Sequence, residues 1–142
     1  MHKFLIFCIL IFPKFVFSQL ELSWNDLEDV EFSDLYVDEM DDYVLWPHFG
    51  SNVRQLDGKE VKITGYVLAI DIDKKYYVLS KGPFASCFFC GVGGPESVLE
   101  LSLKSDKDVF VMDQFLTMKG VLRLNAEDIY RCVYILENAE VY

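Results

Sequence analysis

Basic side chains are scarce in this chain of 142 residues, which has 13 Lys and Arg against 23 Asp and Glu and a formal net charge of −10. A surface this acidic repels phosphate groups, so nucleic acid is not the expected ligand. Glycine is also scarce, at 8 residues, which excludes a collagen-like chain. The composition likewise excludes a coiled-coil rod and a multipass membrane protein.

Histidine is nearly absent, because His2 and His48 are the only two. Haem attachment requires a His after the second Cys of a C-x-x-C pair, and position 91 is Gly. The glycines at 91–94 lack the spacing and the following helix of a phosphate-binding loop, and they oppose the helix that follows a thioredoxin-type C-x-x-C. The sequence shows no pair of carboxylates of the kind that marks the active site of a glycosidase. The sequence therefore predicts a protein that is not an enzyme.

The first 18 residues have the layout of a secretory signal peptide. Lys3 lies before nine apolar residues, Phe4–Phe12, and residues 16–18 suit a signal peptidase that cleaves before Gln19. The apolar run is too short for a transmembrane anchor. We therefore expect a protein exported to the periplasm or secreted, without stable membrane insertion after cleavage. Loss of Lys3 and Lys14 with the signal changes the net charge from −10 to −12.

Residues 19–50 are expected to form an acidic N-terminal arm. Between residues 21 and 42 there are ten acids and no base, with apolar residues interleaved. Ser23, with Asp26 three residues later, predicts the start of a short helix. We expect a short helix or an extended arm that lies on the main domain with its apolar side down. No calcium-loop pattern occurs, so the acids are interpreted as a solvated face.

Residues 51–142 predict a mainly β domain. Hydrophobic alternation changes phase at Gly65, which predicts a β-bulge in a long bent strand, and Gly120 is expected to bend a second long strand in the same way. Five strands with one long bent strand predict an OB-like Greek-key barrel, and a small β-sandwich is the alternative. The expected strands are 61–72, 76–80, 98–103, 115–124 and 130–136.

The loop from Pro83 to Glu96 carries a C-x-x-C pair, Cys87 and Cys90. A tight turn places both sulfurs on one side, where they can bind a soft metal ion such as Zn or Cu. Further ligands would come from Cys132, His48 or the oxygens of Glu96. Because the chain is expected to be exported, a structural disulfide is an alternative, and a redox-active thiol pair is another.

Aromatic side chains from the first hairpin and the cysteine loop could form a ligand-binding face. The alternative is that they pack in the core, where aromatic residues are common. The predicted ligand-binding residues are Phe84, Phe88, Phe89, Tyr66, Tyr77 and Glu96.

The sequence also resembles a known family. Pro47-x-Phe49, the Leu56-to-Lys59 turn followed by Val61, and Gly65-Tyr66 resemble a group of uncharacterised exported proteins and lipoproteins of Gram-negative bacteria. The run Cys87-Phe88-Phe89-Cys90-Gly91, followed by Gly94-Pro95-Glu96, resembles one branch of that group.

The resemblance covers about residues 45–140 and implies a periplasmic protein with an OB-like barrel and a non-catalytic, metal-related role. In that group a His follows the first cysteine by two residues, whereas Phe89 stands there in this sequence and Cys90 comes next.

The sequence therefore predicts a signal peptide (1–18), an acidic arm (19–50) and a barrel domain (51–142). The predicted function is an exported non-catalytic binding protein that holds Zn or Cu through Cys87 and Cys90. The alternatives are a scaffold that binds a protein or another ligand and is pinned by a Cys87–Cys90 disulfide, and a thiol redox protein. The expected partner is an exported or membrane protein of unknown identity.

Overall fold

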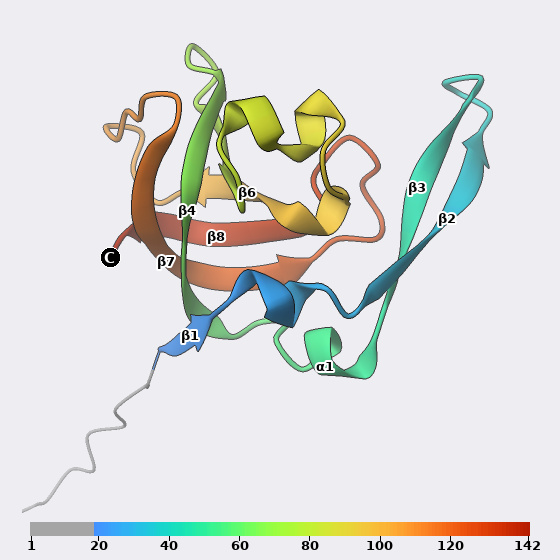
Figure 1. Cartoon of the computed structure of the whole chain (residues 1–142), viewed down its shortest axis with the longest axis horizontal. Coiled ribbons are helices and arrows are strands. Elements are labelled where there is room, and N and C mark those ends of the chain that lie inside the picture. The colour runs from blue at the N-terminus through green and yellow to red at the C-terminus, as the bar shows by residue number, and fades with distance from the viewer. Residues whose placement is uncertain (1–18) are drawn as a thin grey trace, which may run out of the picture.

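The computed structural model describes residues 19–142, and its centre is a closed β-barrel (Figure 1). The strand order is β4-β5-β6-β8-β7, and β7 pairs back with β4. This closure confirms the predicted five-stranded barrel over the sandwich. The barrel strands are β4 (Glu60–Asp71), β5 (Tyr76–Ser80), β6 (Val98–Leu103), β7 (Gln114–Leu124) and β8 (Tyr134–Val141).

The predicted signal peptide, residues 1–18, lies outside the described residues. Within residues 19–142, no helix is long and apolar enough to cross a membrane.

The first described residues pack on the barrel. Strand β1 (Leu20–Leu22) pairs in parallel with β4, and the 3₁₀ turn η1 (Trp24–Leu27) follows it. The backbone N–H and the hydroxyl of Ser23 both donate to Asp26, at 2.8 and 2.7 Å, so the short helix predicted from this pair is present as a single turn. The Trp24 indole N–H donates to the carbonyl of Thr64 at 2.9 Å, which anchors the turn on β4.

The rest of the acidic segment forms a β-hairpin of β2 (Val30–Val37) and β3 (Asp42–Phe49), which projects away from the barrel (Figure 1). The sequence predicted an arm lying on the domain, and this hairpin was not anticipated. Its inner residues Val30, Phe32 and Phe49 pack against the core, but its outer part has no such contact. The short helix α1 (Ser51–Arg54) then returns the chain to the barrel.

Of the two β-bulges predicted at Gly65 and Gly120, only the second is present in the structure. In β7 the register against β8 shifts between Lys119 and Val121, so the bend predicted at Gly120 is present. In β4 the pairing runs without a shift through Gly65, and the bulge lies between Ala69 and Asp71 instead. The prediction of a bulge at Gly65 is therefore wrong.

Gly65 is needed for a close approach of chains rather than for a bend. A Cβ at this position would lie 2.6 Å from the carbonyl oxygen of Ser80, and the Trp24 ring would lie 3.0 Å away. Any side chain would therefore collide with β5, which explains the break in hydrophobic alternation that the sequence shows here.

The last strand begins later than predicted. The alternation from Tyr130 predicted a strand over 130–136, but β8 spans Tyr134–Val141. The Asn125 side-chain amide donates to the carbonyls of Asp128 and Cys132 at 2.8 and 3.1 Å and holds residues 125–133 in a loop. Tyr130 is 72% exposed on that loop.

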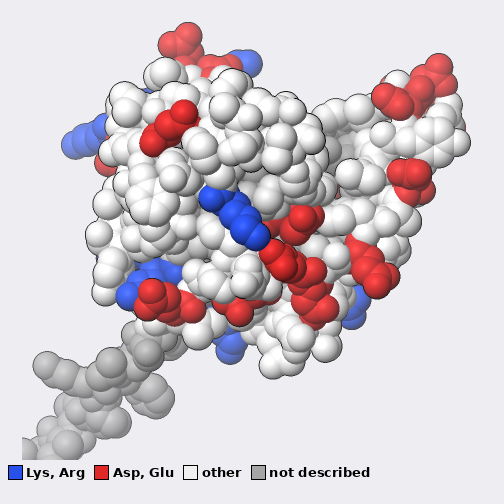
Figure 2. Space-filling view, viewed as in Figure 1, with Lys and Arg blue, Asp and Glu red and all other residues white. Residues whose placement is uncertain are grey.

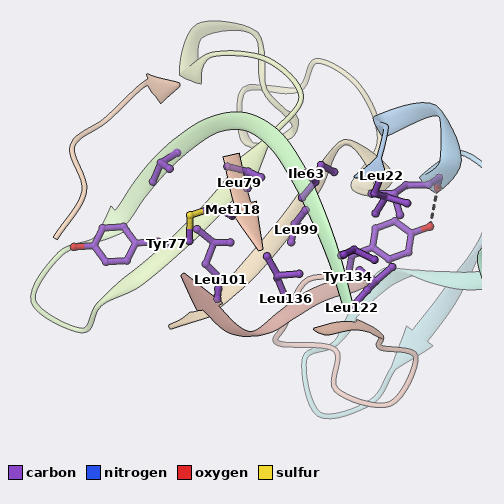
Figure 3. Packing of buried hydrophobic residues seen from close by; sticks show 14 of the residues in the cluster. Leu22, Ile63, Tyr77, Leu79, Leu99, Leu101, Met118, Leu122, Tyr134 and Leu136 are labelled. Atoms are coloured by element: carbon purple, nitrogen blue, oxygen red, sulfur yellow. Dashed lines mark hydrogen bonds between the residues drawn. The ribbon is translucent and has the colours of Figure 1, made fainter. Parts of the chain in front are cut away.

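The barrel interior is filled by aliphatic side chains from every strand (Figure 3). At one end the Tyr134 hydroxyl donates to the carbonyl oxygen of Leu27 at 2.7 Å, a buried bond that joins β8 to η1. Fully or nearly fully buried side chains include Leu22, Ile63, Leu79, Leu99, Leu101, Met118, Leu122 and Leu136.

Two buried tyrosines are expected to respond differently to loss of their hydroxyl. Tyr134→Phe leaves the Leu27 carbonyl buried without its donor, so the free energy of unfolding should fall by about 1–3 kcal/mol. The Tyr77 hydroxyl has no hydrogen-bond partner within residues 19–142, so Tyr77→Phe should be neutral or stabilising. Urea unfolding of both variants measures the difference, and an equal loss in both would contradict it.

Candidate functional site

The cysteine loop connects β5 to β6 and is tied at its base by the Lys81 N–H, which donates to the carbonyl of Ser97 at 2.9 Å. Between these residues the chain makes three short 3₁₀ turns: η2 (Phe84–Ser86), η3 (Phe88–Cys90) and η4 (Pro95–Ser97). Gly91 ends η3 with a φ of 79°, in the left-handed region that glycine adopts without strain. The loop is therefore a compact cap with defined geometry.

The turn η3 brings the two thiols of the C-x-x-C pair together. The N–H groups of Cys90 and Val92 both donate to the carbonyl of Cys87 at 3.1 Å, and the two Sγ atoms lie 3.8 Å apart. The Cys87 side chain is buried against Val78 and Val98, whereas that of Cys90 is exposed. Cys87, Cys90 and Cys132 are all free cysteines in the described part of the chain.

The local environment raises the pKa of two of these thiols, Cys90 and Cys132. Partial desolvation, followed by the neighbouring Cys87 thiol, raises the pKa of Cys90 above its ordinary value. Burial raises the pKa of Cys132 to about 11. A nucleophilic or redox-active cysteine needs the opposite shift, because the thiolate is the reactive form.

An ion pair between the exposed Arg131 and the nearly buried Glu100 holds the loop that precedes β8. The Arg131 Nε donates to Glu100 at 2.9 Å, and Glu100 is only 8% exposed on β6. The Cys132 N–H donates to the second oxygen of the same carboxylate at 3.4 Å. The Cys132 thiol lies 3.9 Å from the Tyr76 hydroxyl at the start of β5. These contacts place residues 129–133 opposite the cysteine loop.

A groove of about 300 Å³ lies between the two loops. Strand β3 of the hairpin forms a third side, and the first residues of β5 and β6 also contribute. Most of its wall is apolar or aromatic, with Arg131 as the charged member. The lining residues are Val44, Leu45, Tyr76, Phe88, Phe89, Pro95, Val98, Ile129, Tyr130, Arg131, Cys132 and Val133.

Three of the predicted site residues line this groove: Phe88, Phe89 and Cys132. Cys87 is buried in the small apolar cluster that Phe88 and Cys132 also contact. Cys90 lies beside Cys87 and is exposed.

The other predicted aromatic residues lie elsewhere. Tyr77 is fully buried in the barrel and packs edge-on against Phe110, with ring centroids 5.3 Å apart. Tyr66 packs on Phe115 at 4.8 Å, and Phe84 is exposed on the cysteine loop outside the groove lining.

The remaining predicted metal ligands are not assembled around the thiol pair. His48 lies on the hairpin, 2.8 Å from the Ser33 hydroxyl, and Glu96 lies in η4. Within residues 19–142, no three His, Cys, Asp or Glu side chains are close enough to hold a metal ion. Of the predicted ligands, the structure thus places only Cys87 and Cys90 within reach of one ion in the described part of the chain.

Four residues that line the groove were not predicted as site residues: Val44, Leu45, Tyr130 and Arg131. Val44 and Leu45 belong to the hairpin that was not predicted, and the other two were assigned to a strand. No motif marks them, because their proximity to the cysteine loop depends on how β6 and β8 pair. An Arg beside a Tyr at the end of a turn was the only available signal.

The fold is a small closed five-stranded β-barrel with a groove on one face. The crystal structure of a DUF3299 family protein from Pseudomonas aeruginosa is similar, with a TM-score of 0.54 and 16% sequence identity over 88% of this chain and 97% of that chain. At this identity the likeness shows the fold alone. No family model matches the sequence, and no curated protein matches it.

The thiol environment predicts the rate of alkylation. At about pH 7.5 iodoacetamide should modify Cys90 more slowly in the folded protein than in urea, because its raised folded-state pKa reduces the thiolate fraction. Within the folded protein, Cys90 should react before Cys132 and Cys87 because it is exposed. Peptide mapping by mass spectrometry gives the three rates. A folded Cys90 that reacts faster than the unfolded one would indicate an activated thiol.

Proposed function

We propose that this chain is an exported, non-catalytic binding protein and that the groove beside the cysteine loop is its ligand site. The observation that carries the proposal is the position of the groove. It lies at the second and third barrel strands, β5 and β6, and at the loop between the fourth and fifth strands, β7 and β8. In OB-type barrels this face and this loop bind ligands.

The lining favours an apolar group of an exported or membrane protein partner. Phe88 and Phe89 lie with their ring centroids 5.6 Å apart on one wall, and Tyr130 contributes from the opposite loop. The charge of Arg131 is matched by Glu100, so the groove offers no free cation for a phosphate. Raised thiol pKa values at Cys90 and Cys132 favour binding over catalysis.

Binding at the groove can be tested with anilinonaphthalene sulfonate, an anionic dye whose aromatic rings bind apolar surfaces and whose fluorescence rises on binding. The double variant Phe89→Ser/Tyr130→Ser removes two exposed ring contacts, and the dye affinity should fall about tenfold, or about 1.4 kcal/mol. Phe115→Ser removes a 62% exposed ring outside the groove and is the matched control. Unchanged saturable binding by the double variant would show that the groove is not the site.

A second candidate function is soft-metal binding by Cys87 and Cys90, which the distance between the thiols favours. Zn–S bonds of about 2.3 Å at tetrahedral angles place two sulfurs about 3.8 Å apart, and the Sγ atoms are separated by 3.8 Å. Zn²⁺ and Cu⁺ both suit thiolate ligands. The protein supplies two ligands, and water or a partner's side chains complete the coordination.

Native mass spectrometry of the exported protein, purified without chelator, tests the metal site. Wild type and Cys132→Ser should both carry one metal ion, whereas Cys87→Ser/Cys90→Ser should carry none. Binding should weaken as the pH falls, because each thiol must lose its proton to become a ligand. A mass lower by two hydrogens with no metal would replace the metal proposal with a Cys87–Cys90 disulfide, the scaffold alternative.

A further inference from the structure

The projecting hairpin has one edge that nothing in residues 19–142 covers. Val44 and Leu45 of β3 line the groove together with the loop at 129–133, so β3 lies on the barrel side. In the outer half of the hairpin, strand β2 lies on the side away from the barrel (Figure 1), and it pairs only with β3 among the described strands. The outer edge of β2 is therefore an unpaired strand edge, which can accept a further strand.

The alternation of hydrogen-bonded and non-hydrogen-bonded pairs between β2 and β3 shows which backbone groups of β2 point away from β3. The Gly50 N–H donates to the carbonyl of Asp29 at 2.8 Å, and the pairing continues in register from Val30 opposite Phe49. In an antiparallel pair, hydrogen-bonded and non-hydrogen-bonded positions alternate. Residues 32, 34 and 36 are therefore non-hydrogen-bonded positions, and their N–H and C=O groups point away from β3.

The outer part of the hairpin, including β2, its turn and the facing residues of β3, carries exposed apolar side chains. Tyr36 and Tyr43 are directly opposite each other, 45% and 65% exposed, with ring centroids 5.2 Å apart. Leu35, Met40 and Leu45 are 39%, 45% and 47% exposed. A surface of this kind can bury apolar side chains of a partner and can place a cation over a tyrosine ring.

The charged side chains of the hairpin are acidic. Residues 30–49 contain six acids and no Lys or Arg, and the outer part of the hairpin shows acidic side chains without basic ones on the face in Figure 2. Within the described residues, none of these six acids forms an ion pair with a Lys or Arg. The acids are Glu31, Asp34, Asp38, Glu39, Asp41 and Asp42.

We propose that the outer edge of β2 binds an extended segment of a partner protein in which basic and apolar residues alternate, and that the segment adds as a third strand. The free N–H and C=O groups supply the main-chain bonds, the apolar side chains supply contact area, and the acids select a basic partner. A second copy of this chain is disfavoured, because two such edges would bring like charges together. The proposal is independent of the groove.

The probe is a fluorescein-labelled peptide of about eight residues that alternates lysine and valine. Fluorescence anisotropy should show saturable binding to the full mature protein, at least tenfold tighter than for the matched glutamate–valine peptide. The affinity should fall as salt rises from about 0.05 M to about 0.5 M, because the charges are solvent-exposed. Asp34→Asn should weaken binding and reduce this salt dependence.

Two proline variants distinguish the two edges of the hairpin. Tyr36→Pro and Tyr43→Pro each remove one ring and one N–H that the ladder does not use, since the two residues form one non-hydrogen-bonded pair. Only Tyr36→Pro blocks the outer edge of β2, so it should lower the affinity at least tenfold more than Tyr43→Pro. Tyr36→Phe keeps the N–H but loses the hydroxyl bond to Asp41, and it should bind like wild type.

Three outcomes would overturn the proposal. The first is no binding of the lysine–valine peptide at about 1 mM, which would mean that the acids only keep the edge unpaired. The second is equal binding of the two peptides. The third is a larger loss with Tyr43→Pro than with Tyr36→Pro. Dye binding at the groove is unaffected by these three results, so failure here is distinguishable from failure of the proposed function.

Discussion

The pairing of β4 with both β5 and β7 is the constraint on which the rest of the structure depends. β4 is 12 residues long, and Tyr66 and Val67 have partners on both β5 and β7. The hydroxyls of Thr64 and Thr117 lie 2.7 Å apart across the closure. Because a closed barrel has no free edge, the loops between strands become the variable surface on which a site can be built.

Closure also determines where the candidate site lies. Parallel pairing of β6 with β8 brings the loop before β8 next to the cysteine loop, although the two are far apart in the sequence. The ion pair between Glu100 and Arg131 then holds the two sides at a separation that leaves a groove. Removing Arg131 would leave the nearly buried Glu100 carboxylate without its cation, which is costly.

The hairpin contributes to two surfaces at once. Its inner strand, β3, forms one side of the groove, and its outer strand, β2, presents a free edge. An isolated two-stranded sheet is only marginally stable, so the packing of Val30, Phe32 and Phe49 on the core anchors it.

The sequence by itself determined the number of barrel strands, their approximate bounds, the short turn at Ser23 and the C-x-x-C turn, because these depend on local alternation and capping. It did not determine the hairpin at 30–49, the position of the bulge in β4 or the start of β8. The acid-rich alternation of the hairpin is compatible with several backbone conformations, and bulges follow from pairing. The groove was decided by tertiary structure alone: Phe88 and Tyr130 meet only because nonlocal strand pairing places their loops on one face of the barrel.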